Sequence, residues 1–139
     1  MLITVEKLCE WLTKERTEVA QQREYLDLRL LVIPPFVCDD GTHISIQASY
    51  FHYCDKKQDE NDETNTDTVV DASAYATFEI CMNSEEIKTN SLRKMDKDCM
   101  DSVIGYVPID LIVAEINAHQ FQQIISLNLT LLASSLSLL

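Results

Sequence analysis

Glycine and proline are scarce in this sequence, which has two glycines and three prolines among its 139 residues. Glycine-rich loops that hold phosphate groups need several glycines close together, because the backbone must approach the ligand without side chains in the way. The scarcity therefore excludes a P-loop and a dinucleotide-binding fingerprint. It also leaves little scope for the tight primed turns of short β-hairpins.

Positive charge is also scarce. The chain has 11 lysines and arginines against 23 aspartates and glutamates, so its formal net charge is −12. Such a charge repels nucleic-acid phosphates, and the densest basic group, Arg93-Lys94 with Lys97, is interrupted by Asp96. We therefore expect no direct binding to DNA or RNA. The expected partner is instead a protein with a basic surface, including a surface that itself holds nucleic acid.

The sequence also lacks metal-binding spacings and long apolar runs. Its five cysteines form no Cys-x-x-Cys or Cys/His pattern, which predicts free thiols in a reducing compartment, with neither a metal nor a cofactor. Met1–Ile3 is followed at once by the polar Thr4 and Glu6, and no apolar run approaches the ~20 residues of a membrane span. We expect a cytoplasmic protein that binds no membrane.

Two long segments alternate between apolar and polar residues. In His43–Cys54, the residues Ile44, Ile46 and Ala48 point one way, which is typical of a strand with one buried face. Ala72–Met82 has the same character, with small alanines followed by larger apolar residues. The sequence predicts that these two segments are neighbouring strands of one antiparallel sheet.

Helical spacing appears near both ends of the chain. Apolar residues at i, i+3 and i+4 predict one helix from Val5 to about Tyr25 and another over 108–119, which Pro108 begins. Shorter alternating runs predict strands over Asp27–Ile33 and 103–107, with Phe36–Cys38 as a connector. The predicted fold class is α+β, a single domain over 1–139 in which about four antiparallel strands are packed on one face by the two helices.

Two further segments have distinctive compositions. Asp55–Asp67 has no apolar residue, which predicts a mobile acidic loop. Asp59, Asn61 and Glu63 alternate within it as calcium ligands do, but the glycine that a calcium loop needs is missing, so no metal is expected. The tail, 121–139, is leucine-rich and uncharged, which favours docking on the core or on a second copy of the chain and predicts a homo-oligomer.

The sequence contains no catalytic motif of a known class. His52 and Cys54 share a face of the predicted strand, but positions two apart are separated by roughly 6.5–7 Å, too far for a thiol–imidazole contact. Carboxylates fall in predicted loops or on predicted exposed helix faces. We therefore expect a protein without enzymatic activity and propose no catalytic residues.

Aromatic residues of the predicted sheet offer an alternative, a small-molecule site. Aromatic rings stack nucleobases and an arginine holds phosphate, so these residues would suit a protein that sequesters a nucleotide signal. The candidate ligand-binding residues are Tyr50, His52, Tyr75, Phe78, Tyr106 and Arg29. The candidate partner-binding residues, in the acidic loop, are Asp59, Glu60, Asp62 and Glu63.

Two segments, SIQASYFHYC and GYVPIDLIVAEINAH, together resemble a pattern in small, functionally unassigned proteins of phages and prophages. There a strand ending in HYC precedes a variable loop, a second strand and a GYVP-helix unit. The resemblance implies a role in which a small acidic phage protein antagonises a host defence system. The predicted function is thus a non-enzymatic acidic binding protein that blocks a host protein; the alternatives are the nucleotide-binding protein and a structural oligomer without a ligand.

Overall fold

The computed structural model describes residues 1–22, 28–57, 68–97, 103–120 and 132–133. It has the predicted α+β fold, with a four-stranded antiparallel sheet in the order β1-β2-β3-β4. The helices are α1 (Val5–Gln22), α2 (Asn90–Lys97) and a helix over residues 109–120. The strands are β1 (Phe36–Val37), β2 (His43–Gln47), β3 (Thr77–Cys81) and β4 (Ile104–Pro108). Short 3-10 turns are η1 (Leu28–Leu30), η2 (Ala72–Ala74) and η3 (Ser84–Glu86).

One face of the sheet forms the core. Residues that pair across neighbouring strands lie on the same face, and the register pairs Ile46 with Ile80, and Ile80 with Ile104. These side chains are at most 2% exposed. The prediction that the two alternating segments are antiparallel neighbours is confirmed, because β2 pairs with β3.

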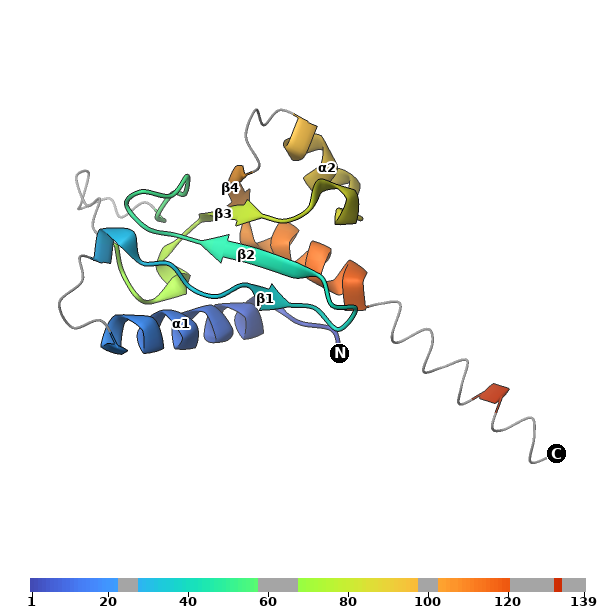
Figure 1. Cartoon of the computed structure of the whole chain (residues 1–139), viewed down its shortest axis with the longest axis horizontal. Coiled ribbons are helices and arrows are strands. Elements are labelled where there is room, and N and C mark those ends of the chain that lie inside the picture. Colours follow the sequence, from blue (N-terminus) through green and yellow to red (C-terminus); the bar gives the residue numbers. More distant parts are fainter. Residues whose placement is uncertain (23–27, 58–67, 98–102, 121–131, 134–139) are drawn as a thin grey trace.

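The terminal helices pack against this core. Leu8 and Leu12 of α1 join Ile112 and Ile116 in one buried cluster with the sheet residues. Figure 1 shows α1 in blue along the lower edge of the sheet and the helix over 109–120 in orange behind β2. The apolar spacing that predicted these helices thus marks the faces that they bury.

Both long strands are shorter than predicted. β2 ends at Gln47, and the chain turns at residues 49–52, where the His52 N–H donates to the Ser49 carbonyl oxygen over 3.1 Å. On β3, the segment before Thr77 forms η2 and an irregular connection. The alternating pattern therefore predicted the right strand pairing but overestimated the length of the strands. Residues in turns can also be exposed and buried by turns along the sequence, so alternation does not show where a strand ends.

The prediction of a strand over Asp27–Ile33 is wrong for the described residues. Leu28–Leu30 forms η1, and the backbone of Ile33 is held by a side chain instead of a strand. Its N–H donates to Gln47 Oε1 over 3.0 Å, and its carbonyl oxygen accepts from Gln47 Nε2 over 2.8 Å. The first strand is instead Phe36–Val37, which the sequence predicted as a connector.

Several predictions fall outside the described residues. These are most of the acidic loop, with the candidate partner-binding residues Asp59, Glu60, Asp62 and Glu63, and the tail except for 132–133. No helix in the described part of the chain is long and apolar enough to cross a membrane.

Candidate binding surface and pocket

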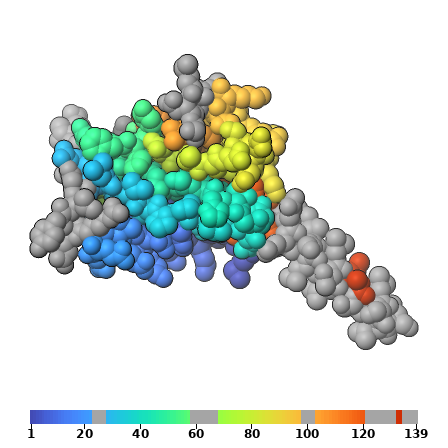
Figure 2. Space-filling view, in the orientation of Figure 1, coloured from blue at the N-terminus to red at the C-terminus, as the bar shows by residue number. Residues whose placement is uncertain are grey.

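Four half-exposed aromatic side chains lie around the loop that follows β2. We call Tyr50, Phe51, Tyr53 and Tyr106 the aromatic surface; each is between 50% and 59% exposed. Tyr50 and Phe51 pack edge to face with ring centroids 5.0 Å apart, and the centroids of Tyr53 and Tyr106 lie 6.1 Å apart. The loop is part of the green region at the upper left of Figure 2. Exposed aromatic clusters of this kind are typical of surfaces that bind other molecules.

The backbone of Tyr53 is fixed from both sides. Its N–H donates to Glu79 Oε2 of β3 over 2.8 Å, and its carbonyl oxygen accepts from the Tyr106 N–H of β4 over 2.9 Å. The loop therefore lies across the β3–β4 pair, at the point where their register shifts between Phe78 and Ile80.

Gly105 makes this close approach possible. A Cβ atom added at Gly105 would lie 2.7 Å from Tyr53 Cβ, so only glycine fits without displacing the loop. The next residue, Tyr106, has a φ of 57°, a left-handed conformation that is rare for a bulky side chain and costs of order 1–3 kcal/mol. The strained backbone places the Tyr106 ring beside Tyr53.

Further hydrogen bonds hold the rest of the loop. The Tyr50 N–H donates to Thr68 Oγ1 over 2.9 Å, and the Asp55 N–H donates to Thr77 Oγ1 over 2.8 Å. The Asp55 carbonyl oxygen in turn accepts from the Ala76 N–H over 2.8 Å. The aromatic side chains are therefore presented by an ordered loop, which reduces the entropy lost on binding.

A pocket of about 250 Å³ opens beside Tyr50. It lies between the loop and the segment that leads into β3. Its lining residues are Ser49, Tyr50, His52, Cys54, Asp55, Lys56 and Tyr75.

Arg16 of α1 supports the pocket from within the core. Its side chain is 1% exposed and donates to the backbone carbonyl oxygens of Ala48, Val69 and Val70, at 2.7 Å for Ala48 and 3.0 Å for Val70. Its guanidinium also lies over the ring of Tyr75, 5.1 Å from the ring centroid. Arg16 thus fixes the two chain segments that flank the pocket.

The thiol of Cys54 and the imidazole of His52 each bond to Ser49. Cys54 Sγ donates to the Ser49 carbonyl oxygen over 3.4 Å, and burial raises the pKa of the thiol. His52 Nδ1 lies 2.5 Å from Ser49 Oγ, and burial lowers the pKa of the imidazole. Both shifts favour neutral groups, whereas a cysteine nucleophile needs a thiolate beside a base.

The structure brings together three of the six candidate ligand-binding residues. Tyr50, His52 and Tyr75 line the pocket. Phe78 is fully buried beneath it, with its ring centroid 6.0 Å from that of Tyr75, and Tyr106 belongs to the aromatic surface. Arg29 lies in η1 and does not line the pocket. The arginine beside the pocket is Arg16, which is not among the six candidates.

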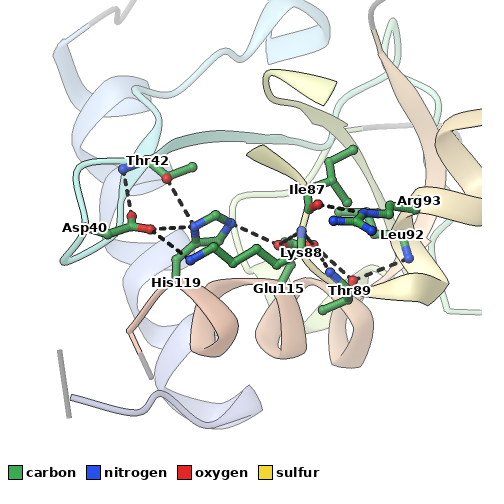
Figure 3. Close-up of polar contacts among 9 residues, drawn as sticks. All are labelled: Asp40, Thr42, Ile87, Lys88, Thr89, Leu92, Arg93, Glu115 and His119. Atoms are coloured by element: carbon green, nitrogen blue, oxygen red, sulfur yellow. Dashed lines mark hydrogen bonds and ion pairs between the residues drawn. The ribbon is translucent and has the colours of Figure 1, made fainter. Parts of the chain in front are cut away.

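A second polar cluster lies at the other end of β2 (Figure 3). His119 is 1% exposed; its Nδ1 lies 2.7 Å from Asp40 Oδ2, and its Nε2 lies 3.0 Å from Glu115 Oε2. Glu115, also 1% exposed, accepts from the N–H groups of Lys88 and Thr89 and from the Thr89 hydroxyl over 2.9 to 3.2 Å. The expectation that carboxylates occupy exposed positions is therefore wrong for Glu115.

This cluster joins three parts of the fold. It links the helix over 109–120 to the turn between β1 and β2 and to the start of α2. Both imidazole nitrogens are already bonded to protein groups and are closed off from solvent, so the arrangement is structural. Among the described residues, no group of three or more metal-binding side chains is placed to hold an ion.

Asp40 makes the stability of the fold sensitive to acid. Burial opposes its ionisation, but hydrogen bonds from the Thr42 backbone N–H, His119 and the Thr42 hydroxyl outweigh it and lower the pKa of Asp40 to about 2. The pKa is thus lower in the folded than in the unfolded chain, where it is about 3.9. The stabilisation is complete above the unfolded pKa and is lost as the pH falls toward 2.

We expect the Asp40→Asn variant to lose this acid dependence. Urea midpoints measured between pH 6 and pH 2 should fall less steeply for Asp40→Asn than for the unsubstituted protein. Asp71→Asn is the comparison variant: hydrogen bonds from Ser73 also lower the pKa of this exposed carboxyl, so its curve should flatten too, but less than that of Asp40→Asn. Parallel midpoint curves for Asp40→Asn and the unsubstituted chain would contradict the assignment.

Comparison with protein-family models, with curated protein sequences and with solved structures finds no match for this chain.

Proposed function

We propose that this protein is a non-catalytic binding protein that holds a partner protein on the aromatic surface. The observation that carries the proposal is the ordered presentation of four half-exposed rings, supported by the left-handed backbone at Tyr106. Tyrosine and other aromatic residues contribute a large share of the binding energy at protein interfaces. Strained backbone conformations are concentrated at functional sites, which supports the same conclusion.

The charge of the chain indicates the chemistry of the partner. The sequence leads from Tyr53 directly into Asp55–Asp67, which contains six carboxylates and two lysines. With a net charge of −12, the protein is attracted to a basic surface and repelled by an acidic one. The partner that we propose is therefore a basic protein, including one whose basic surface holds nucleic acid.

The resemblance to small phage proteins suggests a biological role for this complex. In that role the protein is a phage-encoded antagonist in the bacterial cytoplasm, and it blocks a host defence protein by covering its basic surface. Binding without chemistry is sufficient for this role.

The other two candidate functions have less support. A pocket of about 250 Å³ is smaller than the roughly 300–1,000 Å³ typical of sites for drug-sized ligands, and Arg29 does not line it, so a nucleotide would be poorly enclosed. A structural homo-oligomer would place a second copy of the chain on the aromatic surface. In that case the mass measured by sedimentation should rise with protein concentration, and Phe51→Ala should remove this rise.

The proposal is tested by capture from a host lysate, followed by reconstitution of the captured protein with the purified chain. We expect Phe51→Ala to weaken the reconstituted complex by roughly 2 kcal/mol, about 30-fold in Kd. The complex should also weaken steeply between low and high salt, because its charges are exposed to solvent. Isothermal titration calorimetry at two or more salt concentrations measures both effects.

Val37→Ala is the matched control. Val37 is an apolar residue that is 55% exposed, close to the 59% of Phe51. It pairs with His43 at the opposite end of β2. A complex that is insensitive to Phe51→Ala, or equally sensitive to Val37→Ala, contradicts the proposed surface. Affinity that is unchanged at high salt contradicts a basic partner.

A further inference from the structure

The pocket beside Tyr50 is continuous with the aromatic surface, because Tyr50 contributes to both. Its volume, about 250 Å³, lies below the range of sites for drug-sized ligands, roughly 300–1,000 Å³. A partner that covers the aromatic surface would therefore also cover the mouth of the pocket. The pocket can then receive one side chain of that partner.

The described residues around the pocket include as many anions as cations. Lys56 and Asp55 both line it, Arg16 lies behind Tyr75, and Glu79 acts on His52. The thiol of Cys54 and the imidazole of His52 are held neutral by burial. A charged group that enters this pocket would lose its hydration without gaining a net opposite charge, so the balance selects a neutral occupant.

A cation is further disfavoured by Arg16. Its guanidinium, which is 1% exposed, already lies over the ring of Tyr75 and makes its hydrogen bonds to backbone carbonyl oxygens. A lysine or arginine from the partner would add a like charge close to this buried one. The basic residues of the partner should therefore contact the acidic exterior, and a different kind of side chain should enter the pocket.

His52 offers one hydrogen-bonding group to the occupant. Its Nδ1 is bonded to Ser49, and within the described part of the chain its Nε2 has no hydrogen-bond partner. A phenol hydroxyl both donates and accepts, so it can bond to Nε2 in either tautomer of the imidazole. Tyr50 and Tyr75 supply aromatic walls against which a ring can pack.

We propose that this pocket is an anchor site for one tyrosine side chain of the bound protein. The proposal rests on the proposed function, since it names the residue by which the partner is recognised. Four features of the pocket support the proposal: a volume suited to one side chain, balanced charges, aromatic walls and the imidazole Nε2 of His52.

The test uses the full chain and small probes in place of the partner. N-acetyl-L-tyrosinamide, N-acetyl-L-argininamide and adenosine 5′-monophosphate are titrated separately while ¹H–¹⁵N correlation spectra are recorded. We expect saturable shifts confined to the pocket residues with tyrosinamide, and at least about tenfold weaker binding of the other two. Nuclear Overhauser contacts between the probe ring and the Tyr50 and Tyr75 rings locate the bound probe. Tighter binding of argininamide or of the nucleotide, or the absence of saturable binding, overturns the proposal.

Two variants separate this inference from the proposed function. His52→Phe keeps a ring and removes the polar group, and should weaken tyrosinamide binding about fivefold to tenfold. Val37→Ala, at the opposite end of β2 and outside the pocket lining, should not change tyrosinamide binding. If Phe51→Ala weakens the reconstituted complex while tyrosinamide fails to bind, the pocket proposal fails and the proposed function stands. Thermal unfolding of each variant verifies its fold, and the Overhauser contacts test the site in the unsubstituted chain.

Discussion

Replacing Arg16 with methionine should lower the free energy of unfolding by roughly 3–5 kcal/mol, within the range expected when a buried charged group loses its role as a hydrogen-bond donor. The substitution keeps an unbranched side chain in α1 but leaves the carbonyl oxygens of Ala48, Val69 and Val70 without their donor. Each buried acceptor without a partner costs about 1–3 kcal/mol. Relief from burying a charge offsets part of this loss, so the expected value is below the sum.

Arg16→Lys is the matched control for this prediction. It keeps the charge but lacks the planar group that reaches three carbonyl oxygens at once, so an intermediate loss is expected. Urea unfolding followed by circular dichroism measures all three proteins. If Arg16→Met were as stable as the unsubstituted chain, the carbonyl groups would have to be bonded elsewhere, for example to water in the pocket. Shifted amide resonances at Ala48 and Tyr75 would show that the pocket depends on Arg16.

Replacing Glu115 with alanine should be comparably destabilising, by roughly 3–5 kcal/mol, because it breaks a buried charged network by removing one member. Three donors, the Lys88 and Thr89 N–H groups and the Thr89 hydroxyl, lose their acceptor. His119 also loses the partner of its Nε2. The start of α2 and the helix over 109–120 would no longer be joined by these hydrogen bonds.

Glu115→Gln distinguishes shape from charge at this position. The amide keeps one oxygen acceptor for the backbone N–H groups, so we expect about half the loss seen with alanine, in keeping with the greater strength of hydrogen bonds to charged groups. Denaturant unfolding gives the free energies, and hydrogen exchange at the Lys88 and Thr89 amides reports the local effect. A loss below about 1 kcal/mol for Glu115→Ala would mean that the network contributes little.

The positions of Arg16 and Glu115 relative to the apolar residues of their helices indicate that both side chains are buried. Arg16 follows Leu12 by four residues and precedes Val19 by three, so it lies on the apolar stripe of α1. Glu115 follows Leu111 by four residues and Ile112 by three, so it also lies beside the apolar residues of its helix. Polarity alone suggested exposure for both, whereas their positions on the helix indicated burial. The partners that make this burial tolerable are carbonyl acceptors for Arg16 and N–H and hydroxyl donors for Glu115. They come from distant segments, which no local pattern identifies.

The pairing of β2 with β3 was predictable because an alternating pattern directly reflects one buried face. The end of β2 at Gln47 was not, since the residues after it continue to alternate while the backbone turns. Tyr50, His52 and Tyr75 were recognisable as candidates from their chemistry. Their convergence depends on Thr68, Thr77 and Glu79, whose hydrogen bonds fold the loop back across the sheet.

The contact between Gly105 and Tyr53 restricts which residues related sequences can have at position 105. Since the two positions leave no room for another carbon atom, a larger residue at 105 can be accepted only if the loop at 53 moves away. Because every residue other than glycine carries a Cβ, position 105 should stay glycine in any relative that keeps this loop, whichever side chain stands at 53.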